Sequence, residues 1–264
     1  MAQALAGPLA VISDLHSNKE ALEAVMADIR AAGIARIACL GDVVGYGPDP
    51  EYCIDTVRAH CEVSILGNHD AAVFDGAGDF NPNARAAVEW TRKQLEPGLL
   101  SLHAKRARWR WLQELWSQPR RRMWSEGRFL LLHGSPRDPV REYVLHTDGY
   151  LNPDKVAAIF AGFAGVCVGG HTHHPGLIDD DFRFHEPEFA AGSATLPLPA
   201  GRKAFVNVGS VGQPRDGDAR ACYAILEEDR VTWRRVQYDF RPTQKKIREV
   251  GLPEALARRL ELGR

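Results

Sequence analysis

The sequence predicts an α/β protein in which strands and helices alternate along most of the chain. Short apolar runs of strand length, each followed by a helical pattern, recur from the N-terminal part to about residue 171. Strand-like segments dominate after that point. Polar residues follow five of the early apolar runs, and the carboxyl ends of strands are where open α/β sheets bind ligands. We therefore expect one edge of a sheet to carry a site.

The first unit reads as a strand followed by a helix. The apolar run ends at Asp14, and Ser17 with Glu20 forms an S-x-x-E pattern that predicts the helix start as a capping box. Gly33 predicts its end. The apolar residues between them recur at helical spacing: Leu22, Val25, Met26 and Ile29.

The same alternation continues along the chain. A strand over 34–40 leads to Asp42, and Asp49 with Pro50 at the first helical position predicts a second helix after a glycine-rich loop. The strand 61–67 precedes Asn68. Further on, Asn152 and Pro153 predict a helix start, and residues 165–170 read as a short buried strand.

The C-terminal part has a different pattern. Residues 203–210 and 221–239 read as strands, the latter as a hairpin that turns at Glu228 and Asp229. Residues 241–260 look helical, with an interruption at Gly251 and Pro253. We see no repeat or linker, and expect one domain over 1–264: site motifs at 12–173, a β-rich end at 203–239 and a helical tail at 242–264.

Composition excludes several classes of protein. The chain has 264 residues and a net charge of −1, which argues against bulk affinity for nucleic acid. No stretch reaches the roughly 18 apolar residues that a membrane span needs, and the N-terminus lacks the positive segment of a signal peptide. The five cysteines are odd in number and show no C-x-x-C spacing. We expect reduced thiols in a cytoplasmic protein.

Five short motifs carry the candidate site: SDLH, LGDVVG, LGNHD, LLHGS and GGHTHHP. Their oxygen and nitrogen donors, without a thiolate, suit manganese, iron, zinc, nickel or cobalt better than calcium. The candidate ligands are Asp14, His16, Asp42, Asn68, His133, His171 and His173. This number is too large for one ion, and two divalent ions about 3.5–4 Å apart would clamp the oxygens of an in-line displacement at phosphorus and acidify a bridging water.

Each motif alone has a simpler interpretation. A single histidine after a strand is usually a capping or core residue, which we expect for His60, His103, His146, His174 and His185. The LGNHD segment alone could be a turn, because Gly, Asn and Asp all favour turns. Five such clusters in order, each after a strand, favour the metal site.

The ordered set D-x-H, GD, GNHD, H and GHTH resembles the calcineurin-like metallophosphoesterases, over roughly residues 9–215. The resemblance implies two facing mixed β-sheets flanked by helices, a four-layer sandwich. It implies that one ion is held by Asp14, His16, Asp42 and His173. The other would be held by Asp42, Asn68, His133 and His171. By the same resemblance His69 protonates the leaving-group oxygen, and Asp70 orients it.

Other segments indicate which branch of the family the chain resembles. Segments 133–139 and 207–218 are similar to the small bacterial phosphodiesterase branch, whereas the GDxxDRG and GNHE motifs of protein phosphatases are replaced by GDVVGYG and GNHD. Without the arginine of GDxxDRG, we expect substrate phosphate to contact Arg137 or Arg215, whose guanidinium groups suit phosphate. Tyr46 either stacks on a base or packs in its loop, and packing is favoured.

A basic, tryptophan-rich stretch spans 105–128. It could bind nucleic acid. The favoured interpretation is a helix whose arginines are solvated and whose apolar side chains pack on the core: Trp109, Leu112, Leu115 and Trp116.

The sequence thus favours a dinuclear phosphoesterase that acts on phosphodiester or phosphoanhydride bonds of a small-molecule phosphoester. Dinucleoside polyphosphates, cyclic or linear phosphodiesters and phosphomonoesters stay open as substrates. The alternatives are a non-catalytic scaffold of the same fold, which retention of every ligand opposes, and a nuclease, which the near-zero net charge opposes.

Overall fold

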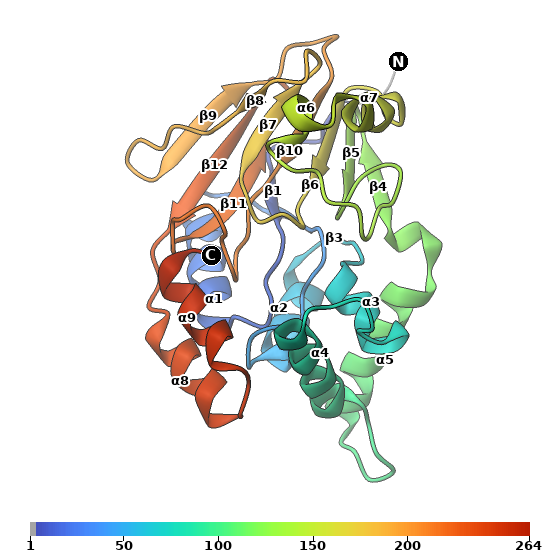
Figure 1. Ribbon diagram of the computed structural model, residues 1–264, viewed down its shortest axis with the longest axis vertical. Helices are drawn as coiled ribbons and strands as arrows, with labels where there is room; N and C mark the ends of the chain where they lie inside the picture. The colour runs from blue at the N-terminus through green and yellow to red at the C-terminus, as the bar shows by residue number, and fades with distance from the viewer. Residues whose placement is uncertain (1–3) are drawn as a thin grey trace.

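Two mixed six-stranded sheets face each other, with helices on their outer sides, in the computed structural model, which describes residues 4–264 (Figure 1). The first sheet has the order β3 (Val63–Ser64), β2 (Arg36–Cys39), β1 (Leu9–Ile12), β11 (Ala221–Leu226), β12 (Arg230–Val236) and β9 (Ser193–Pro197). The second has the order β4 (Met123–Glu126), β5 (Phe129–Leu132), β6 (Val166–Gly169), β10 (Ala204–Asn207), β7 (Gly176–Asp179) and β8 (Phe184–His185). This confirms the two facing mixed sheets.

Parallel and antiparallel strands are segregated within each sheet. Strands β1, β2 and β3 are parallel, and β11, β12 and β9 continue that sheet antiparallel. In the second sheet β5, β6 and β10 are parallel. The carboxyl ends of the parallel strands are the ends from which the five motifs emerge.

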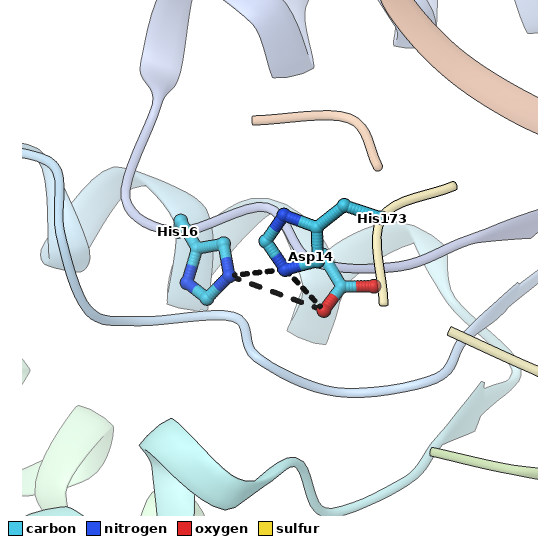
Figure 2. Close-up of side chains that lie close together, drawn as sticks. All are labelled: Asp14, His16 and His173. Atoms are coloured by element: carbon cyan, nitrogen blue, oxygen red, sulfur yellow. Dashed lines mark hydrogen bonds and ion pairs between the residues drawn. The ribbon is translucent and has the colours of Figure 1, made fainter. Parts of the chain in front are cut away.

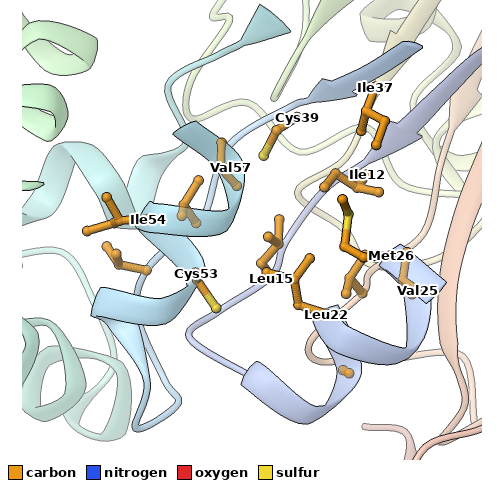
Figure 3. Packing of buried hydrophobic residues seen from close by; sticks show 14 of the residues in the cluster. Ile12, Leu15, Leu22, Val25, Met26, Ile37, Cys39, Cys53, Ile54 and Val57 are labelled. Atoms are coloured by element: carbon orange, nitrogen blue, oxygen red, sulfur yellow. The ribbon is translucent and has the colours of Figure 1, made fainter. Parts of the chain in front are cut away.

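Alternation along β1 places its side chains in two cores. Leu9 and Val11 lie between the sheets with residues such as Val168 of β6, whereas Ala10 and Ile12 face outward. The outward core packs against α1 (Lys19–Ala31) and α2 (Pro50–His60), as Figure 3 shows, and it also includes side chains of α5 (His103–Ser117). A third core joins the second sheet to α7 (Pro153–Ala161), which completes the four layers.

The start of α1 differs from the prediction. The N-cap is Asn18, whose side chain accepts a hydrogen bond from the N–H of Ala21 (3.2 Å), so the predicted Ser17–Glu20 capping box is wrong. The physical reason is the loop: Ser17 has a positive φ (54°), and its carbonyl accepts from the N–H of Asp49. Glu20 instead pairs with Lys246 of the C-terminal part (2.7 Å).

The other predicted helix starts and the hairpin are confirmed. Pro50 and Pro153 are first helical residues, and β11 and β12 turn through 227–229. The tail forms α8 (Arg241–Glu249) and α9 (Glu254–Leu262), which lie beside α1 in Figure 1. Strand β3 is shorter than 61–67, because the N–H of Leu66 donates to the carbonyl of Arg121 rather than to the sheet.

Several elements have no counterpart in the prediction. They are α3 (Asn68–Asp75), α4 (Pro82–Leu95), the 3-10 turn η1 (Pro119–Arg121), α6 (Asp148–Leu151) and strands β4, β7, β8 and β9. The packing interpretation of α5 is confirmed: Leu112 and Leu115 are buried, and Trp109 and Trp116 contact Phe74. Among residues 4–264, none of the helices has the length and apolar character needed to cross a membrane.

Candidate metal centre

The five motifs leave strands β1, β2, β3, β5 and β6 and converge at one place. Five ligand residues have left-handed backbones: Asp14, His16, Asp42, His171 and His173, with φ between 48° and 66°. Such conformations cost about 1–3 kcal/mol each in non-glycine residues and concentrate at functional sites. Here they turn the chain immediately after a strand, so that both polar residues of D-x-H and of H-x-H reach the cluster.

A first group of ligand atoms comes from Asp14, His16 and His173 (Figure 2). The Nε2 atom of His173 lies 3.1 Å from Oδ1 of Asp14 and 3.1 Å from Nε2 of His16. The His16 nitrogen is 3.9 Å from the same oxygen. Ligands at right angles about 2.1 Å from an ion are about 3.0 Å apart, so this spacing fits one divalent metal.

A second group comes from Asn68, His133 and His171. The Nε2 atom of His133 lies 3.1 Å from Oδ1 of Asn68 and 3.1 Å from Nδ1 of His171. The spacing is again that of ligands around one metal.

Asp42 lies between the two groups. Its Oδ2 is 3.6 Å from Nε2 of His16 and 3.6 Å from Nε2 of His133. Its Oδ1 accepts a hydrogen bond from the N–H of His69 (2.8 Å), which fixes the carboxylate. A Cβ on Gly67 would lie 2.1 Å from that oxygen, so glycine is required there. One carboxylate oxygen is thus equally far from a histidine nitrogen of each group.

In each of the four candidate ligand histidines, the ring nitrogen that points away from the cluster determines where the proton lies. Each contacts a backbone carbonyl: His16 that of Val44, His133 that of Leu40, His171 that of Arg141 and His173 that of Gln213. A nitrogen that contacts a carbonyl must donate, so the inner nitrogen of each neutral ring carries a lone pair. The lone pairs of His16 and His173 therefore face each other, as do those of His133 and His171, and a cation in each group would satisfy them.

The pKa shifts of the candidate ligands also fit a metal site. Burial lowers the pKa of all four histidines, that of His173 to about 4, so they are neutral at pH 7 and able to bind metal. Burial and the charges of Asp14 and Asp70 raise the pKa of Asp42. Oδ1 of Asp14 is buried without a hydrogen-bond donor among residues 4–264. Divalent cations would offset these charges and supply the missing partners.

Residues 207–218 hold the backbone and side chains of the first ligand group in position. The hydroxyl of Ser210 donates to the carbonyl of Asp14 (2.9 Å), and the carbonyl of Gln213 accepts from His173. A Cβ on Gly212 would lie 1.8 Å from the carbonyl oxygen of Leu15, so only glycine permits this approach. The motif that the sequence singled out here thus positions ligands.

His69 lines a cleft of about 270 Å³ beside the second group. Its ring packs on Tyr46 (4.4 Å between ring centres) and edge-on against Phe80 (4.8 Å). Its Nδ1 is buried without a hydrogen-bond partner among residues 4–264. A ring nitrogen of His69 also lies within 4.8 Å of ligand atoms of His16 and Asp42. The structure therefore brings His69 to the site both as a candidate proton donor and within reach of metal.

Asp70 contacts backbone groups rather than the His69 ring. Its two oxygens accept hydrogen bonds from the backbone N–H groups of Val44 and Gly67 (both 3.1 Å). It thereby ties the loop after Asp42 to the start of α3, rather than holding the His69 ring. Among the described residues no hydrogen bond joins Asp70 to the His69 ring, and the contacts of Asp70 favour a role in shaping the loop.

The two arginines expected to contact phosphate are placed differently. Arg215 lies next to the first group, because its backbone N–H donates to the carbonyl of His173 (3.2 Å). Arg137 pairs with Glu142 (3.3 Å) and lines a separate hollow with Trp116 and Arg122. The structure thus brings Arg215, and not Arg137, to the metal cluster.

Residues that no motif announced complete the cleft. Tyr143 stacks on His171 (3.8 Å between ring centres), and Phe80 and Arg141 line the same space. They come from irregular segments that have no helix or strand periodicity. The turn at 76–81 is the one sequence signal that could have pointed to Phe80. Tyr46 is 7% exposed, which confirms its packing role.

The remaining histidines lie outside the ligand groups. His146 stacks on His174, and His185 pairs with Asp179 (2.7 Å). All five cysteines are free, and four of them are buried.

Comparisons with known proteins agree with this fold and site. Residues 8–230 match the family model of the calcineurin-like phosphoesterase superfamily domain. The chain therefore belongs to that superfamily. Its fold and its clusters of candidate metal ligands are those of a metallophosphoesterase. The family indicates a hydrolase that binds divalent metal.

Individual relatives span nearly the whole chain. An uncharacterized protein of Methanocaldococcus jannaschii is 34% identical over 261 residues, 97% of this chain and 98% of that protein. The crystal structure of a metallophosphoesterase from Sphaerobacter thermophilus has 38% identity, covers 98% of this chain and 100% of its own, and has a TM-score of 0.80. A hypothetical protein from Pyrococcus horikoshii OT3 shares the fold, at 19% identity, a TM-score of 0.71, and coverage of 97% and 98%.

Proposed function

We propose that this protein is a dinuclear metal-dependent phosphoesterase that hydrolyses phosphodiester or phosphoanhydride bonds of nucleotides or other small phosphoesters. The observation that carries the proposal is the position of Asp42 between two ligand groups, 3.6 Å from a nitrogen of each. Two ions that share this carboxylate would supply Lewis-acid stabilisation of the phosphoryl oxygens and a water of lowered pKa. Manganese is our first choice, with iron, zinc, nickel or cobalt as alternatives.

The chain's own residues have separable tasks in this proposal. Asp14, His16 and His173 hold one ion, Asn68, His133 and His171 hold the other, and Asp42 serves both. His69, at the wall of the cleft, would donate a proton to the leaving-group oxygen. Arg215, beside His173, would bind substrate phosphate and orient it.

The substrate would enter through the cleft of about 270 Å³. Its wall combines aromatic rings with polar groups, namely Tyr46, Phe80, Asp79, Asn81 and Tyr143. Such a wall suits a small organic group attached to phosphate better than a protein chain. The five free cysteines support a reducing, cytoplasmic setting.

The test is hydrolysis of bis(p-nitrophenyl) phosphate by protein loaded with manganese, compared with EDTA-treated protein. His171→Asn should abolish the activity and lower metal content. His185→Asn, a half-exposed histidine paired with Asp179 outside the cluster, is the matched control and should keep both. Metal-independent hydrolysis, or an inactive protein that retains two ions per chain, would refute the proposal. A nucleotide panel resolved by chromatography then ranks the substrates.

A further inference from the structure

Two arginine side chains meet on the ring of Tyr46, next to the metal cluster. The guanidinium carbon of Arg215 lies 5.8 Å from the ring centre, and that of Arg259 lies 5.7 Å from it. The same ring packs on His16 and His69. Two cations from distant parts of the chain are therefore brought to one aromatic side chain that also lines the cleft.

The position of Arg259 is set by a buried core. Helix α9 packs Leu256 and Leu260 against Tyr46 and against Ala84 of α4. The side-chain amide of Gln244 in α8 donates to the carbonyl of Ala257 (2.9 Å), which joins the two C-terminal helices. Arg259 is thus held by packing, and it lies beyond residues 8–230, the part that the family model matches.

Neither arginine pairs with an Asp or Glu side chain among residues 4–264. Elsewhere in the chain, Arg235 pairs with Asp216 and Arg248 with Glu254. Arg215 instead donates to Oε1 of Gln213 (2.9 Å), and Arg259 donates through Nε to the main-chain oxygen of Arg264 (2.8 Å). Within residues 4–264, neither arginine forms an ion pair with an Asp or Glu side chain, and Nε of Arg215 is buried without a hydrogen-bond partner.

Two half-buried guanidinium groups on one aromatic ring repel each other, and Nε of Arg215 still lacks a hydrogen-bond acceptor among the described residues. Burial and the charge of Arg215 lower the pKa of Arg259, which reports the same strain. An anion bound by both would relieve it. Guanidinium groups bind phosphate oxygens in a bidentate manner, so a phosphoryl group matches the chemistry.

We propose that Arg215 and Arg259 form a second anion subsite, which binds a phosphoryl group adjacent to the one held at the metal centre. The proposal rests on the proposed function and narrows its substrates. It selects compounds with at least two linked phosphoryl groups, such as nucleoside polyphosphates, over simple phosphomonoesters and diesters. The backbone contact between Arg215 and His173 places this subsite directly beside the first ligand group.

The experiment is calorimetric binding of methylenediphosphonate and of methylphosphonate to the metal-loaded, full-length protein, with metal content measured before and after. Arg259→Met keeps the length of the side chain and removes its charge. Because it loses a charged hydrogen bond, this variant should bind methylenediphosphonate about tenfold or more weakly than the wild type and bind methylphosphonate within about twofold of it. The matched control is Arg258→Met, on the same helix, 74% exposed and paired with Glu254, which should change neither.

Equal binding of methylenediphosphonate by the wild type and Arg259→Met would overturn the subsite, and so would an equal loss of both ligands. Arg259→Lys retains a cation and should keep most of the selectivity, and an unchanged Tm in both variants shows that the fold is intact. Calorimetry requires no turnover. A wild type that fails to hydrolyse bis(p-nitrophenyl) phosphate but prefers the diphosphonate would refute the proposed function and leave the subsite in place.

Discussion

The Oδ2 atom of Asp42 lies 3.6 Å from Nε2 of His133, and the same oxygen is equally far from Nε2 of His16. One buried carboxylate oxygen therefore faces both ligand groups, while its partner oxygen is fixed by the backbone of His69. The geometry makes Asp42 the link between the two proposed ions. Changes at this residue should affect both positions at once.

We expect Asp42→Asn to abolish activity and to lower metal occupancy at both positions, because an amide cannot replace the negative charge. Loss of even an outer partner of a metal ligand typically costs about 10–100-fold in metal affinity, so the loss here should be at least that large. Metal analysis of purified protein measures it. Asp180→Asn, at a surface residue that pairs with Arg202 outside the cluster, is the control. Two ions per chain in Asp42→Asn would contradict the assignment.

A second prediction distinguishes Arg215 from Arg137, which the sequence analysis proposed together as contacts of the substrate phosphate. Arg215→Ala should raise KM for a multiply charged nucleotide more than it lowers kcat, because uniform phosphate binding appears mainly in KM. Arg137→Ala should leave both constants near wild type, since Arg137 pairs with Glu142 in a separate hollow. Steady-state kinetics decide. Equal effects of the two changes would show that the cleft extends to Arg137.

All seven candidate ligands could be identified from the sequence because each one ends a strand or lies within a few residues of that end. Strand periodicity and ligand chemistry are local properties, so they can be read without the fold. The backbone contacts of Asp70 could not be predicted, because a carboxylate next to His69 can accept either from that ring or from backbone N–H groups, and the loop geometry decides which. Arg259 and Phe80 could not be found, because they reach the site only through the packing of α9 and the turn before α4.

The new role of Asp70 is itself testable. Asp70→Asn keeps one acceptor oxygen and places an N–H₂ group against a backbone donor, at Val44 or Gly67. An unsatisfied buried donor costs about 1–3 kcal/mol, so the free energy of unfolding should fall by about that amount. Urea unfolding measures it. If stability is unchanged and only the dependence on leaving group is altered, Asp70 acts through His69 after all.

A pH prediction concerns Asp148, at the start of α6, far from the ligand motifs in sequence. Burial alone would raise its pKa, but the hydrogen bond from Lys155 (2.6 Å) and those from Leu145 and Asn152 lower it below the ordinary value. A lowered folded-state pKa contributes stability above pH 3.8 that is lost as pH falls through the folded pKa. Asp148→Asn should therefore destabilise the protein at pH 7, by about 1–3 kcal/mol, and progressively less below pH 3.8. Urea unfolding at pH 7 and at a pH below 3.8 checks this. An equal loss of unfolding free energy at the two pH values would show that the charge of Asp148 is not involved.

The last prediction decides the role of His69. Its ring lines the cleft beside Asn68, yet a ring nitrogen also lies within 4.8 Å of ligand atoms of His16 and Asp42. If His69 is the proton donor, His69→Asn should spare both metals. Proton donation contributes about 10²–10⁴ in rate, and more for basic leaving groups, so turnover of an alkyl or ribosyl ester should fall far more than that of a p-nitrophenyl ester. Rates for both ester classes, with metal content determined on the same samples, measure this. Loss of one ion together with equal slowing of both classes would make His69 a ligand, and Asp42 would then face three histidines rather than two.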